Sequence, residues 1–175
     1  MSQRNHVRAI RFWLAVIIAG LVLSGVTAFP LETEVRVFRS LLQTSALRPI
    51  AESTHLLPWI GRVHDALSAT NQYYPFLAYG TDWLAFAHLV IAIAFLGPYR
   101  DPVRNKWIVT FGLIACAGVI PLALIAGHIR GIPMAWRCID CSFGVFGAIP
   151  LLLCRQHILA LETMGEQVHL FETVR

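Results

Sequence analysis

Four apolar runs dominate the pattern of hydrophobic and polar positions along the chain. Residues 12–29 carry no charge, and a helix of this length nearly crosses a hydrocarbon core about 30 Å thick. Three further runs follow at residues 81–97, 107–127 and 139–154. The pattern predicts four transmembrane helices.

Two segments between the first and second runs have apolar positions at helical spacing, at residues 32–44 and 57–69. Such segments are typical of amphipathic helices that lie on a bilayer or across a bundle. We therefore expect a helical extramembrane cap over residues 30–80. Residues 155–175 have a similar period and predict a cytoplasmic amphipathic tail.

Composition agrees with a membrane protein, since 57% of residues are hydrophobic and only 14% are charged. The run at residues 12–29 is longer than the apolar region of most signal peptides, so we expect it to be retained as the first helix. Residues 1–175 then form one all-α domain. Its expected architecture is an integral membrane four-helix bundle with the cap between the first and second helices.

The net charge of +4 is scattered along the chain and forms no basic stripe, which argues against nucleic-acid binding. Positive residues are densest in the N-terminal tail and in the loop at residues 98–106. Cytoplasmic loops of membrane proteins carry such an excess. We therefore expect a multi-pass protein of a bacterial inner membrane, with both termini cytoplasmic and the cap on the outer side.

Polar residues crowd the turn between the third and fourth runs, at residues 126–144. A charge at the centre of a bilayer costs about 3 kcal/mol on insertion scales, so ionisable residues there are candidates for function. His128 would close the third helix and Asp140 would open the fourth. With the predicted topology, Asp82 and His88 of the second helix converge on the same outer end.

Asp140 is expected to point into the bundle. Gly144 and Gly147 share its helical face, and small residues mark contacts between membrane helices. A buried carboxylate needs a partner, which Arg130 or Arg137 would supply.

Three kinds of chemistry fit these residues. In the first, His88, His128 and Asp140 form a catalytic or metal-binding set, because imidazole and carboxylate are common ligands of zinc and iron. The same pocket would bind a small amphipathic or lipid-like ligand and perform acid/base chemistry on it. A haem held by the two histidines is a variant. The residues expected to contact the ligand are Arg130, Arg137, Asp82 and, from the cap, His64.

In the second, Cys138 and Cys141 form a redox-active Cys-x-x-Cys pair, since a thiol at a helix N-terminus has a lowered pKa. Four helices with this motif at the outer start of the last one resemble the vitamin K epoxide reductase and DsbB group of thiol oxidoreductases. That resemblance implies a quinone as electron acceptor. Members of the group also use a second cysteine pair in a loop, and the cap of this chain has no cysteine.

In the third, the polar residues only stabilise packing. Asp140 would form a buried ion pair that fixes the helix register, and His88 would be a hydrogen-bonded core histidine. The chain would then be an accessory or structural subunit of a membrane complex.

The phrases GTDWLAFAH, GPYRDPVRNKW and WRCIDCSFG resemble an uncharacterised group of small four-helix bacterial inner-membrane proteins. This resemblance spans the second to fourth helices and agrees with the predicted topology. It implies no activity and no catalytic residue.

Overall fold

The computed structural model describes residues 2–173, with side chains as far as residue 164. Every element in that range is helical, which confirms the all-α prediction. In chain order the elements are α1 (Gln3–Ala28), α2 (Leu31–Thr44), α3 (Arg48–Ser53), α4 (Leu56–Tyr73), η1 (Pro75–Ala78), α5 (Tyr79–Ala94), α6 (Leu96–Arg100), α7 (Lys106–Pro121), η2 (Leu122–Ala126), α8 (Gly127–Ile129) and α9 (Met134–Thr173).

Four helical stretches are long and apolar enough to cross a membrane. They are Gln3–Ala28, Pro75–Arg100, Lys106–Ile129 and Met134–Met164. Their length and composition fit an integral, multi-pass membrane protein. The amphipathic α2 and α4 occupy the ranges where the sequence predicts cap helices.

The last helix differs most from its prediction. α9 begins at Met134 instead of residue 139, and it continues without a break through most of the predicted tail. Its 40 residues give a length of about 60 Å at helical rise, which exceeds the thickness of a bilayer core. The tail is therefore an extension of the fourth candidate membrane helix. Residues 174–175 lie outside the described range.

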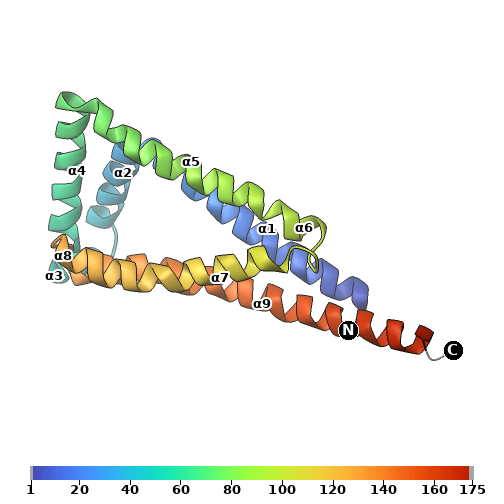
Figure 1. Cartoon of the computed structure of the whole chain (residues 1–175). Helices are drawn as coiled ribbons and strands as arrows, with labels where there is room; N and C mark the ends of the chain where they lie inside the picture. The colour runs from blue at the N-terminus through green and yellow to red at the C-terminus, as the bar shows by residue number, and fades with distance from the viewer. Residues whose placement is uncertain (1, 174–175) are drawn as a thin grey trace.

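The four long helices form two pairs that diverge (Figure 1). α1 packs along α5, α7 packs along α9, and α1 also packs against α9. We call these pairs the α1/α5 arm and the α7/α9 arm. They meet at the end that holds the N-terminus, here called the joined end, and separate toward α2 and α4 at the wide end.

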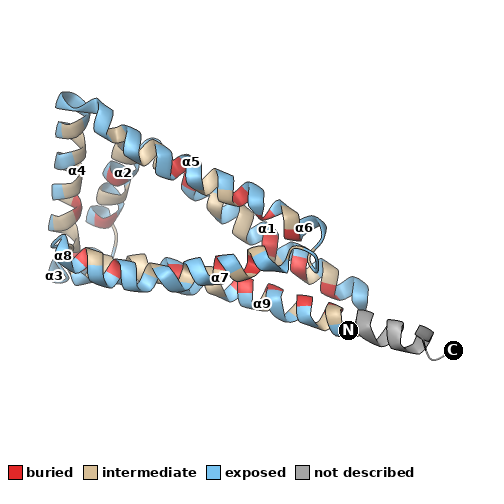
Figure 2. Cartoon of the chain, in the orientation of Figure 1, coloured by how far each residue is buried: buried red, intermediate tan, exposed pale blue. Residues whose placement is uncertain are grey.

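The main hydrophobic core lies where the arms meet (Figure 2). It joins Ile10 and Leu14 of α1 to Leu151, Cys154 and Ile158 of α9, all at most 2% exposed. Membrane helices gain little from the hydrophobic effect between themselves, so close packing and dispersion must supply the attraction. The packing contacts between the two arms are concentrated at the joined end, where these core residues lie.

The wide end is closed by the cap, which has a small core of its own. Val35 and Leu42 of α2 pack with Ile60 of α4 in that core. Trp136 of α9 packs against it, with its ring centroid 6.5 Å from that of Phe38. The cap thus touches the α7/α9 arm at the start of α4 and continues through η1 into α5.

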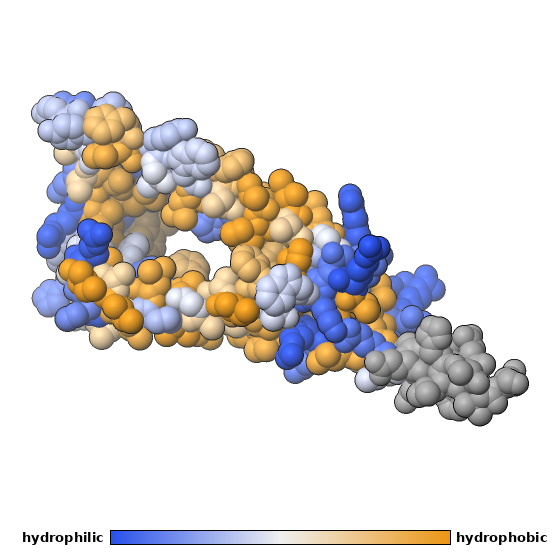
Figure 3. Space-filling model, in the orientation of Figure 1, coloured by the Kyte–Doolittle hydropathy of each residue, from blue (hydrophilic) through white to orange (hydrophobic). Residues whose placement is uncertain are grey.

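The surface has an apolar middle section between two more hydrophilic ends (Figure 3). An opening passes through the molecule in this view, bounded by the two arms and the cap. We call it the inter-arm opening. It lies along the wide-end halves of helices that are long and apolar enough to span a bilayer.

Candidate functional site

The polar turn at residues 126–144 begins with an irregular end of the third candidate membrane helix, Lys106–Ile129. Pro121 cannot donate the backbone hydrogen bond of a regular helix. The residues that follow it, η2, form a π-helical turn. Such turns are rare and often occur at functional sites.

The turn itself is fixed by Gly131. This residue has φ +67°, a conformation that costs a residue with a side chain about 1 kcal/mol or more. Its N–H donates to His128 O at 3.1 Å, and the Ile132 N–H donates to Gly127 O at 2.9 Å. These two bonds form a Schellman motif, which ends α8 and redirects the chain into α9.

Arg137 stabilises this turn. A Cβ atom on Gly127 would lie 2.6 Å from its Cδ, so the arginine stem rests directly on the glycine backbone. Its Nη1 donates to Leu124 O in η2 at 3.4 Å, and its Nε is buried with no hydrogen-bond partner in the described structure. Arg137 therefore connects α9 to the π-helical turn. Its contact with an anionic ligand stays a prediction.

Asp140 lies on the expected face of α9 but without the expected partner. Gly144 and Gly147 do mark a close helix contact, because a Cβ on Gly144 would lie 2.5 Å from Cys116 O of α7. Asp140 itself is half-buried. The ion pairs recorded among the described residues do not include it, so the predicted pair with Arg130 or Arg137 is not formed.

His88 lies on the side of α5 that continues from the core at the joined end. It lies two helical turns before Phe95, which is 2% exposed in the core between the arms, and therefore on the same face. Its Nδ1 lies 2.8 Å from Leu84 O, one turn earlier in α5. The same face of α5 therefore carries the buried Phe95 at the joined end and the half-buried imidazole of His88 where the arms diverge.

The predicted convergence at the outer end does not occur. Asp82 lies in the first turn of α5, whereas His128 and Arg130 are exposed at the end of α8. α4 separates these two corners of the molecule (Figure 1), and its length is about 27 Å at helical rise. His64 lies on α4 and has its Nδ1 3.5 Å from Asp65 Oδ1 instead of contacting a shared pocket.

The predicted metal site has no support in the described part of the chain. Within the described range, no three side chains of His, Cys, Asp or Glu are placed to hold a metal ion. His88 belongs to the α1/α5 arm, whereas His128 follows α7 and Asp140 lies in α9, and the two arms diverge. The sequence predicts them at one end of a four-helix bundle, which would require the helices to stay packed up to that end.

Cys138 and Cys141 are both free thiols. They lie inside α9, whose first residue is Met134, and not at its N-terminus. Cys138 is exposed. It lies two residues beyond Trp136, so the side chains of Cys138 and Trp136 point about 200° apart around the helix. The predicted thiol pair therefore lies away from the face that contacts the cap.

A histidine pair at the joined end was missed by the sequence analysis. His6 of α1 and His157 of α9 have their Nδ1 atoms 3.0 Å apart, and His6 is only 9% exposed. One imidazole must donate and the other accept. Their separation by nearly the whole chain leaves no local sequence signal.

Two further positions lie on helical faces that continue from the core toward the wide end. Phe143 is 69% exposed. It lies on the same face of α9 as Trp136, two turns earlier, and the buried Pro150, two turns later. Ser24 lies two turns beyond Ile17, which packs into the core of the joined end, and Ser24 is exposed. Both faces are covered where the arms meet and uncovered where they diverge.

No family model, curated protein or solved structure matches this chain. The resemblances drawn from its sequence phrases and its Cys-x-x-Cys motif therefore stay predictions.

Proposed function

We propose that this chain is a bacterial inner-membrane protein that holds one amphipathic, lipid-like molecule in the inter-arm opening. Both termini are cytoplasmic in this proposal. Its support is the excess of arginine in the N-terminal tail and in the loop at residues 98–106. The joined end then faces the cytoplasm and the cap lies outside.

The observation that carries the proposal is the inter-arm opening itself (Figure 3). An empty space at membrane depth would deprive its lining of dispersion contacts, and water is a poor occupant of an apolar space. Phe143 is exposed, whereas Trp136 and Pro150 on the same face of α9 are packed against the cap and buried, respectively. An exposed aromatic ring between two covered positions favours an apolar occupant. An acyl chain or an isoprenoid chain has the required shape and chemistry.

Polar groups beside the opening favour an amphipathic molecule over a plain hydrocarbon. His88 faces the opening from the α1/α5 arm, and one ring nitrogen remains beyond the Nδ1 that lies against Leu84 O. Half-buried Asp140 lies near the outer end of the other arm. A hydroxyl, carbonyl or amine of the bound molecule would find a hydrogen-bond partner on either side.

The experiment fills the opening with a side chain. Ser24→Trp places an indole on the face of α1 that continues from Ile17, whereas Leu23→Trp places it on the adjacent, 65% exposed position that points away. Each protein is purified in mild detergent, and extracted amphipathic molecules are quantified per chain by mass spectrometry. We expect close to one molecule per chain in the wild type and in Leu23→Trp, and loss of it in Ser24→Trp.

Phe143→Ala tests the opposite wall without adding bulk, and we expect it to lower retention as well. Circular dichroism and thermal unfolding check that each variant is folded. Equal retention in the two tryptophan variants would place the molecule elsewhere. A stoichiometric protein that co-purifies with the wild type and is lost from Ser24→Trp would show that a partner helix fills the opening, and would overturn the proposal.

A further inference from the structure

A second, independent feature lies at the joined end, between the first turn of α7 and the facing side of α9. It is a cavity of about 190 Å³. Its lining combines cationic, aromatic and aliphatic side chains: Lys106, Trp107, Thr110, Arg155, Ile158 and Leu159.

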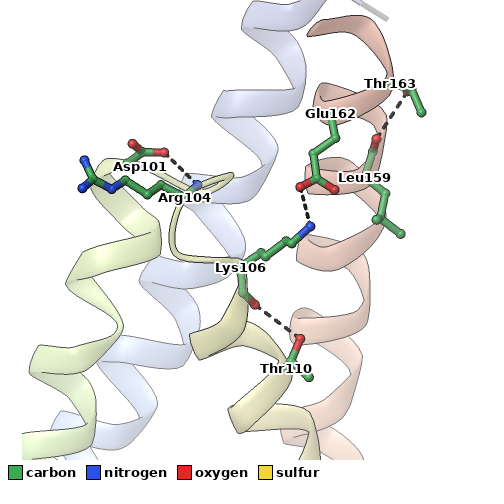
Figure 4. Close-up of polar contacts among 7 residues, drawn as sticks. All are labelled: Asp101, Arg104, Lys106, Thr110, Leu159, Glu162 and Thr163. Carbon is green, nitrogen blue, oxygen red and sulfur yellow. Dashed lines mark hydrogen bonds and ion pairs between the residues drawn. The ribbon is translucent and has the colours of Figure 1, made fainter. Parts of the chain in front are cut away.

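The two cations of the cavity differ in their partners: Lys106 forms an ion pair, and Arg155 forms none that is recorded within the described range. Lys106 Nζ lies 2.8 Å from Glu162 Oε1 of α9 (Figure 4), and the lysine side chain is 58% exposed. Such exposed pairs contribute little to stability and exchange partners readily.

The apolar side of the cavity is open to the surroundings of the helices. Trp107 is 67% exposed and Leu159 is 44% exposed. Tryptophan is enriched where membrane helices leave the hydrocarbon core. Hydrophilic side chains gather at this end of the molecule, next to the apolar middle section (Figure 3). The cavity therefore lies where a lipid headgroup meets its acyl chains.

We infer that this cavity binds the phosphate group of an anionic phospholipid. Arg155 and Lys106 contact the phosphate, and the acyl chains run along Trp107 and Leu159. Basic pockets between membrane helices on the cytoplasmic side bind anionic headgroups in this way. A soluble phosphate would use the two cations but would gain nothing from the exposed apolar wall, so the lipid is the better occupant.

Native mass spectrometry of the full chain in detergent tests the inference. Phosphatidylglycerol and phosphatidylcholine with identical acyl chains are titrated separately. We expect the anionic lipid to bind more tightly, and Arg155→Gln to weaken its binding about fivefold, the effect typical of one cation near a lipid surface. Arg155→Lys should retain most of the affinity.

Arg104→Gln is the matched control, because Arg104 is a cation of the same end that does not line the cavity. We expect it to leave binding unchanged. An equal loss with Arg104→Gln would reveal a general charge effect and overturn the site. Equal affinity for the two lipids, or displacement of the lipid by inorganic phosphate, would also overturn it. The inter-arm molecule is unaffected by these variants, so this test and that of the proposed function succeed or fail separately.

Discussion

At the scale of single residues, glycines decide where helices can touch. Gly144 brings α9 within contact of the α7 backbone, where an added Cβ would lie 2.5 Å from Cys116 O. Gly118 on α7 has no atom within 4 Å of such a Cβ. The sequence predicted the first contact correctly, because Gly144 and Gly147 lie on one helical face. It could not predict that neither Arg130 nor Arg137 pairs with Asp140, since that depends on where α8 ends and on the contact of Arg137 with Gly127.

Gly144→Ala should therefore destabilise the protein by about 1–3 kcal/mol, because a backbone oxygen cannot move aside as a flexible side chain can. Gly118→Ala should be neutral or slightly stabilising, because alanine favours the helix and meets no neighbour. Thermal unfolding in detergent measures both changes. Equal effects of the two substitutions would mean that α7 and α9 do not approach at Gly144.

At the scale of elements, the connection from α7 to α9 departs most from regular helix. Pro121, the π-helical turn and the Schellman motif at Gly131 follow one another within a short stretch. Pro121 is visible in the sequence as a cause of a kink. The π-helical turn is not, because it depends on how the chain closes against Arg137.

Gly131→Ala should cost about 1 kcal/mol, because alanine is strained at φ +67°. Gly131→Asn should cost less, since asparagine tolerates that conformation better. Gly80→Ala in α5, where nothing lies within 4 Å, is the control and should be neutral. The measurement is the unfolding midpoint, and an effect of Gly80→Ala as large as that of Gly131→Ala would argue against a strain at the turn.

At the scale of the whole molecule, the two arms pack directly against each other at the joined end, and at the wide end the cap lies between them. Apolar periodicity predicted the helices and the cap, because each is a local property of the chain. It could not predict that α5 leaves α7 and α9 toward the wide end, since divergence is set by packing between distant segments. The predicted metal set depended on that unknown packing, which is why His88, His128 and Asp140 are not assembled.

The histidine pair tests the joined end. His157→Phe removes one partner and leaves His6 unsatisfied in a buried contact, which should cost about 1–3 kcal/mol. The double variant His6→Phe with His157→Phe should cost less than the sum of the single variants. A double-mutant cycle of unfolding free energies measures this coupling. Strict additivity would show that the two rings do not interact across the arms.

The central claim, that the space between the arms holds one amphipathic molecule, is tested most directly by the native mass of the purified wild-type chain. Detergent is exchanged extensively before the measurement, so that loosely attached lipids are removed. We expect one adduct of a single mass per chain, released only when the chain unfolds. A spectrum of bare chain alone, or a graded series of exchangeable lipids with no dominant species, would contradict the claim.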